Sequence, residues 1–208
     1  MTGPSDPRRI LAETDWSGLE NRNGPAYPET PDLLAGLASE EQAASEAGIF
    51  HLTYELIDYP NVHTAAVPAA HYVAVLVGDP RTGNRRRADL LTWLATLAGA
   101  VSDARERDFV ELAGYSPMDH PTSTFRKVRD IRPHLFAGVA ACLDDPDPVV
   151  REAAVAAAVV LAEAPELASR RAMLKPLIKD VLAVSSSSAH RQLATTALRS
   201  WGDASGPA

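Results

Sequence analysis

The residues best suited to chemistry lie in the segment HLTYELIDYPNVH, which begins at His51. His51 and Glu55 are four residues apart and would share one face of a helix, as would Tyr54 and Asp58. A metal site could be built from His51, Glu55 and His63. Helical zinc sites, however, use two histidines at the four-residue spacing, and this segment has one histidine and one glutamate there. We therefore expect no metal and no cofactor, and interpret the segment as a hydrogen-bonded helix face or a partner-binding surface.

Signatures of other enzyme chemistry are absent from the sequence. It contains no glycine-rich phosphate loop, no GxSxG nucleophile motif and no CxxC pair. Its one cysteine, Cys142, lies in an apolar helical pattern and is expected to be a buried thiol, and a single cysteine excludes a disulfide within the chain. We expect no catalytic residue and a protein that is not an enzyme.

The formal charge of −7 is unevenly distributed along the chain. Residues 1–60 contain three arginines and eleven acidic residues, a net charge of −8, whereas the remaining 148 residues have a net charge of +1. An acidic region repels nucleic acid and anionic membranes and attracts basic partners. No stretch reaches the roughly 18 apolar residues of a membrane span. We therefore expect no membrane interaction and a cytoplasmic protein.

Helices must position these residues, and the clearest one lies within residues 144–165. Asp147 can cap a helix that starts at Pro148, and Pro165 can stop it. An apolar stripe at three- and four-residue spacing runs along this helix, formed by Val150, Ala154, Ala158 and Leu161. Such a helix needs neighbours that cover its stripe.

Looser versions of the same pattern predict four helix pairs. The pairs are 28–37 with 39–59, 64–77 with 85–101, 129–143 with 148–164, and 167–184 with 189–201. Aligned by pattern, the second helices place one column of equivalent residues at Ser45, Arg87, Arg151 and Arg191. The column spacings of 42, 64 and 40 residues indicate a period of about 40 with one insertion in the middle interval.

The insertion is predicted at residues 103–128, where prolines and polar residues break the period. This insert also contains apolar side chains, namely Phe109, Tyr115, Met118 and Phe125. A long loop in a compact protein is typically functional or disordered, and the apolar content favours a functional loop.

The opening of the clearest helix, a turn followed by Pro-x-x-Arg-x-x-Ala, resembles the second helix of a HEAT-type repeat. The resemblance covers residues 28–202 and implies an all-α fold, a short α-α superhelix of about four pairs with an inserted loop between pairs two and three. We expect residues 1–27 to be a flexible start with a short capping helix, Ile10–Leu19, that includes Trp16. Residues 203–208 are expected to be a disordered tail. Proteins that resemble this scaffold mostly bind other macromolecules and share no catalytic residue.

We therefore expect a non-enzymatic module that binds a basic protein through its concave face and acidic N-terminal half, as an immunity protein or antitoxin covers a toxin. The candidate contact residues are Glu46, His51, Tyr54, Glu55, Asp58, Trp93, Tyr115 and Met118. The alternative is a nucleic-acid binder or an enzyme similar to HEAT-like DNA glycosylases that uses Arg85, Arg86 and Arg87. Three adjacent arginines on a helix point in three directions and the chain is acidic, so we do not expect nucleic acid as the partner. The sequence does not indicate an oligomeric state.

Overall fold

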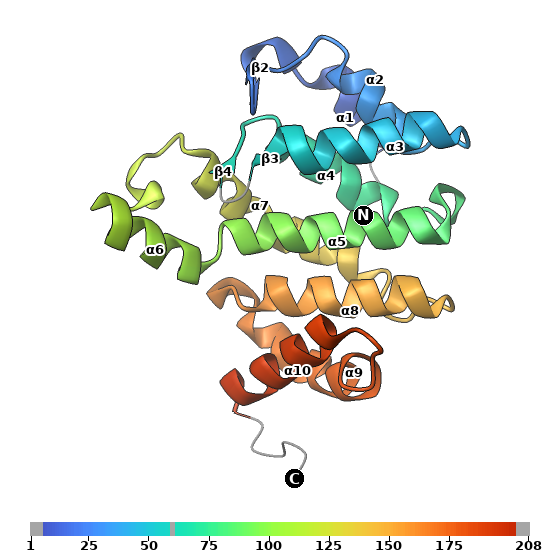
Figure 1. Cartoon of the computed structure of the whole chain (residues 1–208), viewed down its shortest axis with the longest axis vertical. Helices are drawn as coiled ribbons and strands as arrows, with labels where there is room; N and C mark the ends of the chain where they lie inside the picture. The colour runs from blue at the N-terminus through green and yellow to red at the C-terminus, as the bar shows by residue number, and fades with distance from the viewer. Residues whose placement is uncertain (1–5, 59–60, 203–208) are drawn as a thin grey trace.

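The protein is built from helices. A computed structural model describes residues 6–58 and 61–202, and this part of the chain forms ten α-helices, several short 3₁₀ and π segments, and two small hairpins (Figure 1). The prediction of an all-α protein is confirmed. The predicted disordered tail, 203–208, lies outside the described residues, as do the first five residues of the predicted flexible start.

The elements follow one another in this order. The α-helices are α1 Pro7–Glu13, α2 Thr30–Gly36, α3 Gln42–Phe50, α4 Ala66–Leu76, α5 Asn84–Ala100, α6 Asp103–Ala113, α7 Thr124–Ala140, α8 Pro148–Ala162, α9 Arg171–Leu177 and α10 Ser188–Ser200. The 3₁₀ segments are η1 Trp16–Gly18, η3 Pro80–Thr82, η4 Pro117–Asp119 and η5 Pro165–Arg170, and the π-helical segments are η2 His51–Leu56 and η6 Ile178–Leu182. One antiparallel hairpin pairs β1 Glu20–Asn21 with β2 Gly24–Pro25, and the other pairs β3 Ile57–Asp58 with β4 Asn61–Val62.

The helices lie in two layers. In Figure 1, α3, α5, α8 and α10 follow one another from top to bottom in the front layer, while α4 and α7 lie behind them. The most extensive contacts are those of α5 with α8 and of α4 with α7, which are the equivalent helices of two consecutive pairs. The pair α4–α5 and the pair α7–α8 therefore pack first helix on first helix and second helix on second helix.

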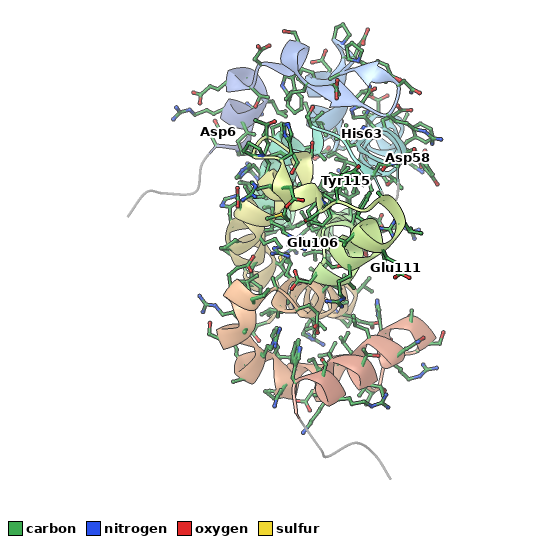
Figure 2. All side chains as sticks on the ribbon, turned by 90° about the vertical axis from the view of Figure 1, so that its left-hand side faces the viewer. Asp6, Asp58, His63, Glu106, Glu111 and Tyr115 are labelled. Carbon is green, nitrogen blue, oxygen red and sulfur yellow. The ribbon has the colours of Figure 1, made fainter. Side chains whose placement is uncertain are left out.

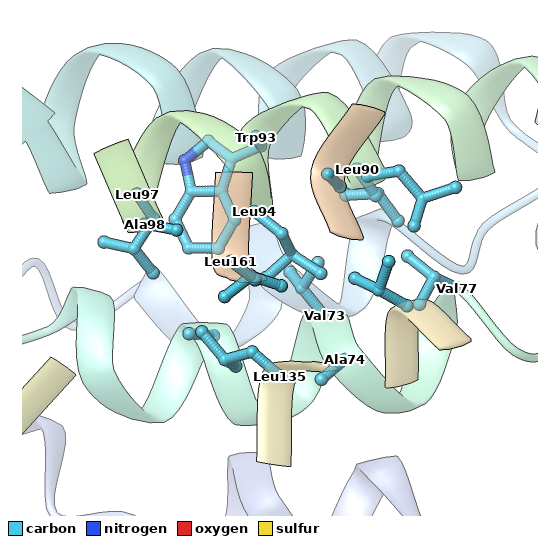
Figure 3. Packing of buried hydrophobic residues seen from close by; sticks show 14 of the residues in the cluster. Val73, Ala74, Val77, Leu90, Trp93, Leu94, Leu97, Ala98, Leu135 and Leu161 are labelled. Carbon is cyan, nitrogen blue, oxygen red and sulfur yellow. The ribbon is translucent and has the colours of Figure 1, made fainter. Parts of the chain in front are cut away.

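The core lies between these two layers (Figure 3). Val73 and Ala74 of α4 face Leu94 of α5, Leu135 of α7 and Leu161 of α8, and all five are buried. The α4 and α7 backbones approach closely at Gly138, because a Cβ there would lie 2.3 Å from the carbonyl oxygen of Ala74. Small residues thus allow the close contact that these two helices make.

The arginines of the predicted column hold the turns inside two of the pairs. Arg151 donates a hydrogen bond from Nη1 to the carbonyl of Asp145 at 2.8 Å, and Arg191 donates from Nη1 to the carbonyl of Ser185 at 2.6 Å. Each bond spans six residues and closes the turn before the second helix of its pair. Equivalent positions in the two pairs therefore make the same contact.

The insert has more regular structure than the loop predicted over 103–128. It contains α6 and η4, and its last residues already belong to α7. The Ser102 hydroxyl accepts a hydrogen bond from the backbone N–H of Arg105 and caps α6, while Gly114, with φ of 77°, ends it in the left-handed conformation. The predicted loop is therefore the helix α6 followed by residues 114–123, which we call the return segment, and by the start of α7.

Three other predicted helices differ from the structure. The helix predicted over 39–59 ends earlier, because α3 continues into the π segment η2 and then into β3. The helix predicted over 167–184 is divided into η5, α9 and η6. The N-terminal helix predicted at Ile10–Leu19 instead spans Pro7–Glu13, where Asp6 caps the first turn. Trp16 follows it in η1 and is buried, with its indole N–H donated to the carbonyl of Leu11. Helix α1 packs on α2 and α4, at one end of the stacked helices.

Candidate functional site

One face of α3 and η2 presents a stripe of polar and aromatic side chains to solvent. Gln42, Glu46, Phe50 and Tyr54 follow at four-residue spacing and are all exposed. The Phe50 and Tyr54 rings, which are 57% and 54% exposed, lie 4.9 Å apart between centroids. Gly48 packs the opposite face of α3 on α2, where a Cβ would meet the carbonyl of Leu33 at 2.6 Å. We call Gln42, Glu46, Phe50 and Tyr54 the α3 stripe.

The α3 stripe includes two predicted contact residues, Glu46 and Tyr54, and one residue that the sequence reading missed. Phe50 lies midway between them at the same spacing, so the periodicity could have identified it. Exposed aromatic side chains on a rigid helix are common anchors at protein interfaces.

Acidic side chains surround this end of the protein. Within residues 6–58, eight exposed carboxylates have no recorded ion pair: Asp6, Asp15, Glu20, Glu29, Asp32, Glu40, Glu41 and Glu46. Glu46 accepts a hydrogen bond from Gln42 at 2.6 Å, which leaves its charge uncompensated. Much of the negative charge of the N-terminal part is therefore available to a partner.

Two predicted acidic contacts are instead engaged inside the protein. Glu55 accepts hydrogen bonds from the Asn23 amide at 2.8 Å and the Tyr27 hydroxyl at 3.2 Å, which ties η2 to the segment around the first hairpin. Asp58 lies 3.6 Å from Nε of Arg22. Glu55 thus fastens the first hairpin to η2, and Asp58 joins the first hairpin to the second.

Of the histidines of the same segment, His51 is buried and His63 is partly buried. His51 is 2% exposed and His63 is half-buried, and neither Nε2 atom has a hydrogen-bond partner among the described residues. Burial lowers the pKa of both imidazoles, although Glu55 opposes the effect at His51 and Asp58 opposes it at His63. No three metal-ligating side chains converge anywhere in the described ranges. His51 is therefore a core residue and not the surface contact that the sequence predicts.

Trp93 is also part of the core. It is 5% exposed and lies among the buried apolar residues of Figure 3. Its indole N–H donates to the carbonyl of Leu52 at 2.9 Å, which joins α5 to η2. The predicted role of Trp93 as a surface anchor is thus incompatible with its burial.

The three adjacent arginines have separate roles. Arg86 donates to two carbonyl oxygens in the turn between α2 and α3, at 3.1 and 2.6 Å. Arg87 is buried and pairs with Asp145 at 2.6 Å. Only Arg85 is exposed without a recorded partner among the described residues. The triplet is therefore not a phosphate-binding patch, and the nucleic-acid alternative loses its main support.

A cleft opens between the insert and the β3–β4 hairpin. It has a volume of about 510 Å³ and lies between β4, α6, the return segment and the start of α7. Its apolar wall consists of Val62, Phe109, Tyr115, Pro117 and Phe125. Figure 2 shows Tyr115 at the surface of the insert, between Glu106 and the region of Asp58 and His63. We call this space the insert cleft.

A capping box shapes the return segment beside the insert cleft. The Ser116 hydroxyl accepts from the backbone N–H of Met118 at 3.0 Å, and the Asp119 carboxylate accepts from the backbone N–H of Ser116 at 3.2 Å. The Ser116 hydroxyl also donates to Glu106. This bond and the bond from Arg129 hold the pKa of Glu106 below its usual value, although burial opposes the effect. Met118 is half-buried against the core, so of the two predicted contacts in the insert only Tyr115 is well exposed.

Ion pairs hold the insert on α7 around a second cavity of about 530 Å³. Arg129 lies 3.0 Å from Asp103 and 2.7 Å from Glu106, and Arg132 lies 2.8 Å from Glu166. These pairs connect α6, α7 and η5. The insert is therefore fixed to the scaffold at its base.

A serine, a glutamate and a histidine meet between α8 and α10, but not in a catalytic arrangement. The Ser185 hydroxyl donates to Glu152 at 2.6 Å, and Nδ1 of His190 lies 2.5 Å from the same oxygen. A nucleophilic serine would instead donate to the imidazole. The cluster connects the third pair to the fourth.

Comparisons with protein families, curated proteins and solved structures found no match for this chain. The functional argument therefore rests on the geometry of the α3 stripe and the insert cleft. Among the described helices, none is both long and apolar enough to cross a membrane.

Proposed function

We propose that this protein is a non-enzymatic binding module that recognises a basic protein partner through the α3 stripe and the acidic surface around it. The observation that supports this most directly is the exposed Phe50–Tyr54 pair next to Glu46, within a region of unpaired carboxylates. Aromatic anchors supply binding energy at interfaces, while surrounding charges raise the association rate and select partners of opposite sign.

We infer a HEAT-like repeat scaffold for this surface. The equivalent turn contacts of Arg151 and Arg191 support a repeating unit, as does the packing of α5 on α8 and of α4 on α7. In such a scaffold the second helices of the pairs line a concave face. The α3 stripe would then lie at the N-terminal end of that face.

The narrower proposal is an immunity or antitoxin function. A basic toxin has a cationic surface that binds nucleic acid or another anion, and an acidic protein with aromatic anchors can cover that surface. The negative charge of this surface is complementary to such a target and would speed association, and the helix that supports the aromatic anchors is already formed before binding.

The test begins with capture of partners from cells of the source organism on the immobilised protein, followed by kinetics with the captured protein. Glu46→Lys should slow association by roughly threefold at low salt, with less effect at high salt, because it reverses one steering charge. Asp180→Lys is the matched control, since it makes the same charge change at an exposed position in η6 of the last helix pair.

The aromatic anchors are tested through dissociation. Replacing Phe50 and Tyr54 together by alanine should weaken binding about 30-fold, the equivalent of about 2 kcal/mol for one hot spot, mainly through faster dissociation. A captured protein that is acidic, or that binds both variants as tightly as the parent protein, would refute the proposal.

A further inference from the structure

The insert cleft contains an aromatic corner. The rings of Phe109 in α6 and Phe125 in α7 meet at 89°, with centroids 6.2 Å apart, and both contribute to the cleft wall. Tyr115 stands at the open edge, 58% exposed. A flat ring that entered this corner could stack on one phenyl group and meet the other edge to face, the two arrangements that aromatic pairs prefer.

Arginines stand against both rings from outside the cleft. The guanidinium of Arg129 lies 4.7 Å from the Phe125 centroid, and that of Arg105 lies 5.3 Å from the Phe109 centroid. Neither arginine contributes to the cleft wall, and Arg129 faces the second cavity instead. Each guanidinium already makes a cation–π contact with its phenyl ring, so that ring attracts a second cation less strongly. The corner therefore favours an uncharged ring over a lysine or arginine side chain.

Exposed apolar residues on α6, the helix that contributes Phe109 to the cleft, indicate that its ligand belongs to a protein. Leu112 is 83% exposed and Val110 is 47% exposed, both on α6, and Tyr115 follows in the return segment. A small free ligand would leave Leu112 in water, whereas a protein surface that reaches into the cleft could cover it. Grouped exposed apolar residues next to a concave site are typical of protein interfaces.

We propose that the insert cleft receives an uncharged aromatic side chain of the protein partner, while the basic residues of that partner face the α3 stripe. This inference rests on the proposed function for the identity of the partner. The β3–β4 hairpin connects the two surfaces, because β3 follows the η2 end of the α3 stripe and β4 contributes Asn61 and Val62 to the cleft. One partner could therefore contact both.

The experiment uses blocked amino acids as probes on the full-length protein. N-acetyl-tryptophanamide and N-acetyl-argininamide are titrated separately while backbone amide signals are followed by NMR. The tryptophan probe should cause saturable shifts of cleft residues, with a Kd in the millimolar range, and the arginine probe should not. Free indole is a third probe, because weaker binding by N-acetyl-tryptophanamide than by indole would mean that the cleft has no room for a peptide backbone, and would overturn the proposal.

Two variants locate the binding. Tyr115→Ala removes an exposed ring from the cleft edge and should weaken the tryptophan probe about threefold to tenfold, the range expected for one aromatic contact. Leu112→Ala removes an exposed residue outside the cleft wall and should leave the probe affinity unchanged.

The outcomes separate this inference from the proposed function. Absence of saturable shifts, shifts outside the cleft, or preference for the arginine probe would overturn the aromatic site. None of these results would affect the α3 stripe, because its test depends on the Glu46 and Phe50–Tyr54 variants and on a different measurement.

Discussion

Removal of one partner from the buried pair of Arg87 and Asp145 should be one of the most destabilising polar substitutions in this protein. Their side chains are 6% and 9% exposed, and Nη2 of Arg87 lies 2.6 Å from Oδ2 of Asp145. Nε of Arg87 donates to the carbonyl of Val77 at 2.7 Å, and the thiol of Cys142 donates to the same carbonyl at 3.1 Å. The pair thus joins α5 to the turn before α8.

Asp145→Ala leaves the Arg87 guanidinium buried without a counter-ion. Removing one partner of a buried pair costs about 3–5 kcal/mol, mostly because the remaining charge stays desolvated. For a chain of this length the same loss corresponds to a decrease in Tm of roughly 6–20 °C. Urea denaturation followed by circular dichroism, together with a thermal melt, measures both quantities.

Two further variants identify the cause. Arg81→Gln breaks the exposed pair with Asp79, which has nearly the same length of 2.7 Å, and should change stability by less than the measurement error. Replacing Arg87 by Met together with Asp145 by Leu should recover most of the loss, because no buried charge remains. Equal effects of Asp145→Ala and Arg81→Gln would show that burial of the pair contributes nothing.

Two other predictions concern close packing and pH. Gly138→Ala should destabilise the protein by about 1–3 kcal/mol, because the new methyl group meets the Ala74 carbonyl. Gly99→Ala should instead stabilise it by about 0.5–1 kcal/mol, because its Cβ meets open space within a helix. Thermal melts of both variants distinguish a packing effect from a general effect of losing glycine. Burial lowers the folded-state pKa of His51 and His63, so below pH of about 6.5 the unfolded chain binds more protons and stability falls by up to about 1.4 kcal/mol per pH unit for each histidine. Denaturation series between pH 7.5 and 5 should show a smaller slope in His51→Gln, and an equal slope would contradict the assignment.

The fold could be predicted where local signals agree. Asp147 and Pro148 start α8 as the sequence predicts, and the Asp147 carboxylate accepts from the backbone N–H groups of Val149 and Val150. The insert was harder, because Ser102 and Gly114 mark α6 clearly but the prolines that follow suggested a loop throughout. The end of α3 depends on the pairing of β3 with β4, and no local sequence pattern predicts that pairing.

The candidate site divides in the same way. Four-residue spacing was sufficient to place Glu46 and Tyr54 on an exposed face. The burial of Trp93 depends on the packing of η2 against α5, where the Trp93 indole N–H donates to the carbonyl of Leu52. The spacing of residues within α5 does not reveal that packing. Likewise, Glu55 is occupied by Asn23 and Tyr27 from the first hairpin, a contact between distant segments that spacing within one helix cannot reveal.

The arginine contacts also affect whether the protein would tolerate the insertion or removal of a helix pair. The recorded side-chain hydrogen bonds of Arg151 and Arg191 go only to the main chain of the turn inside their own helix pair. A duplicated helix pair would therefore contain both partners of this contact. Arg87 reaches into the next unit, to the side chain of Asp145, and a cut between those two would separate a buried cation from its anion. An extra segment between α5 and α7 should therefore destabilise the protein through the buried Arg87–Asp145 pair, whereas one after residue 164 would separate Arg132 from Glu166, whose side chain is more exposed than that of Asp145.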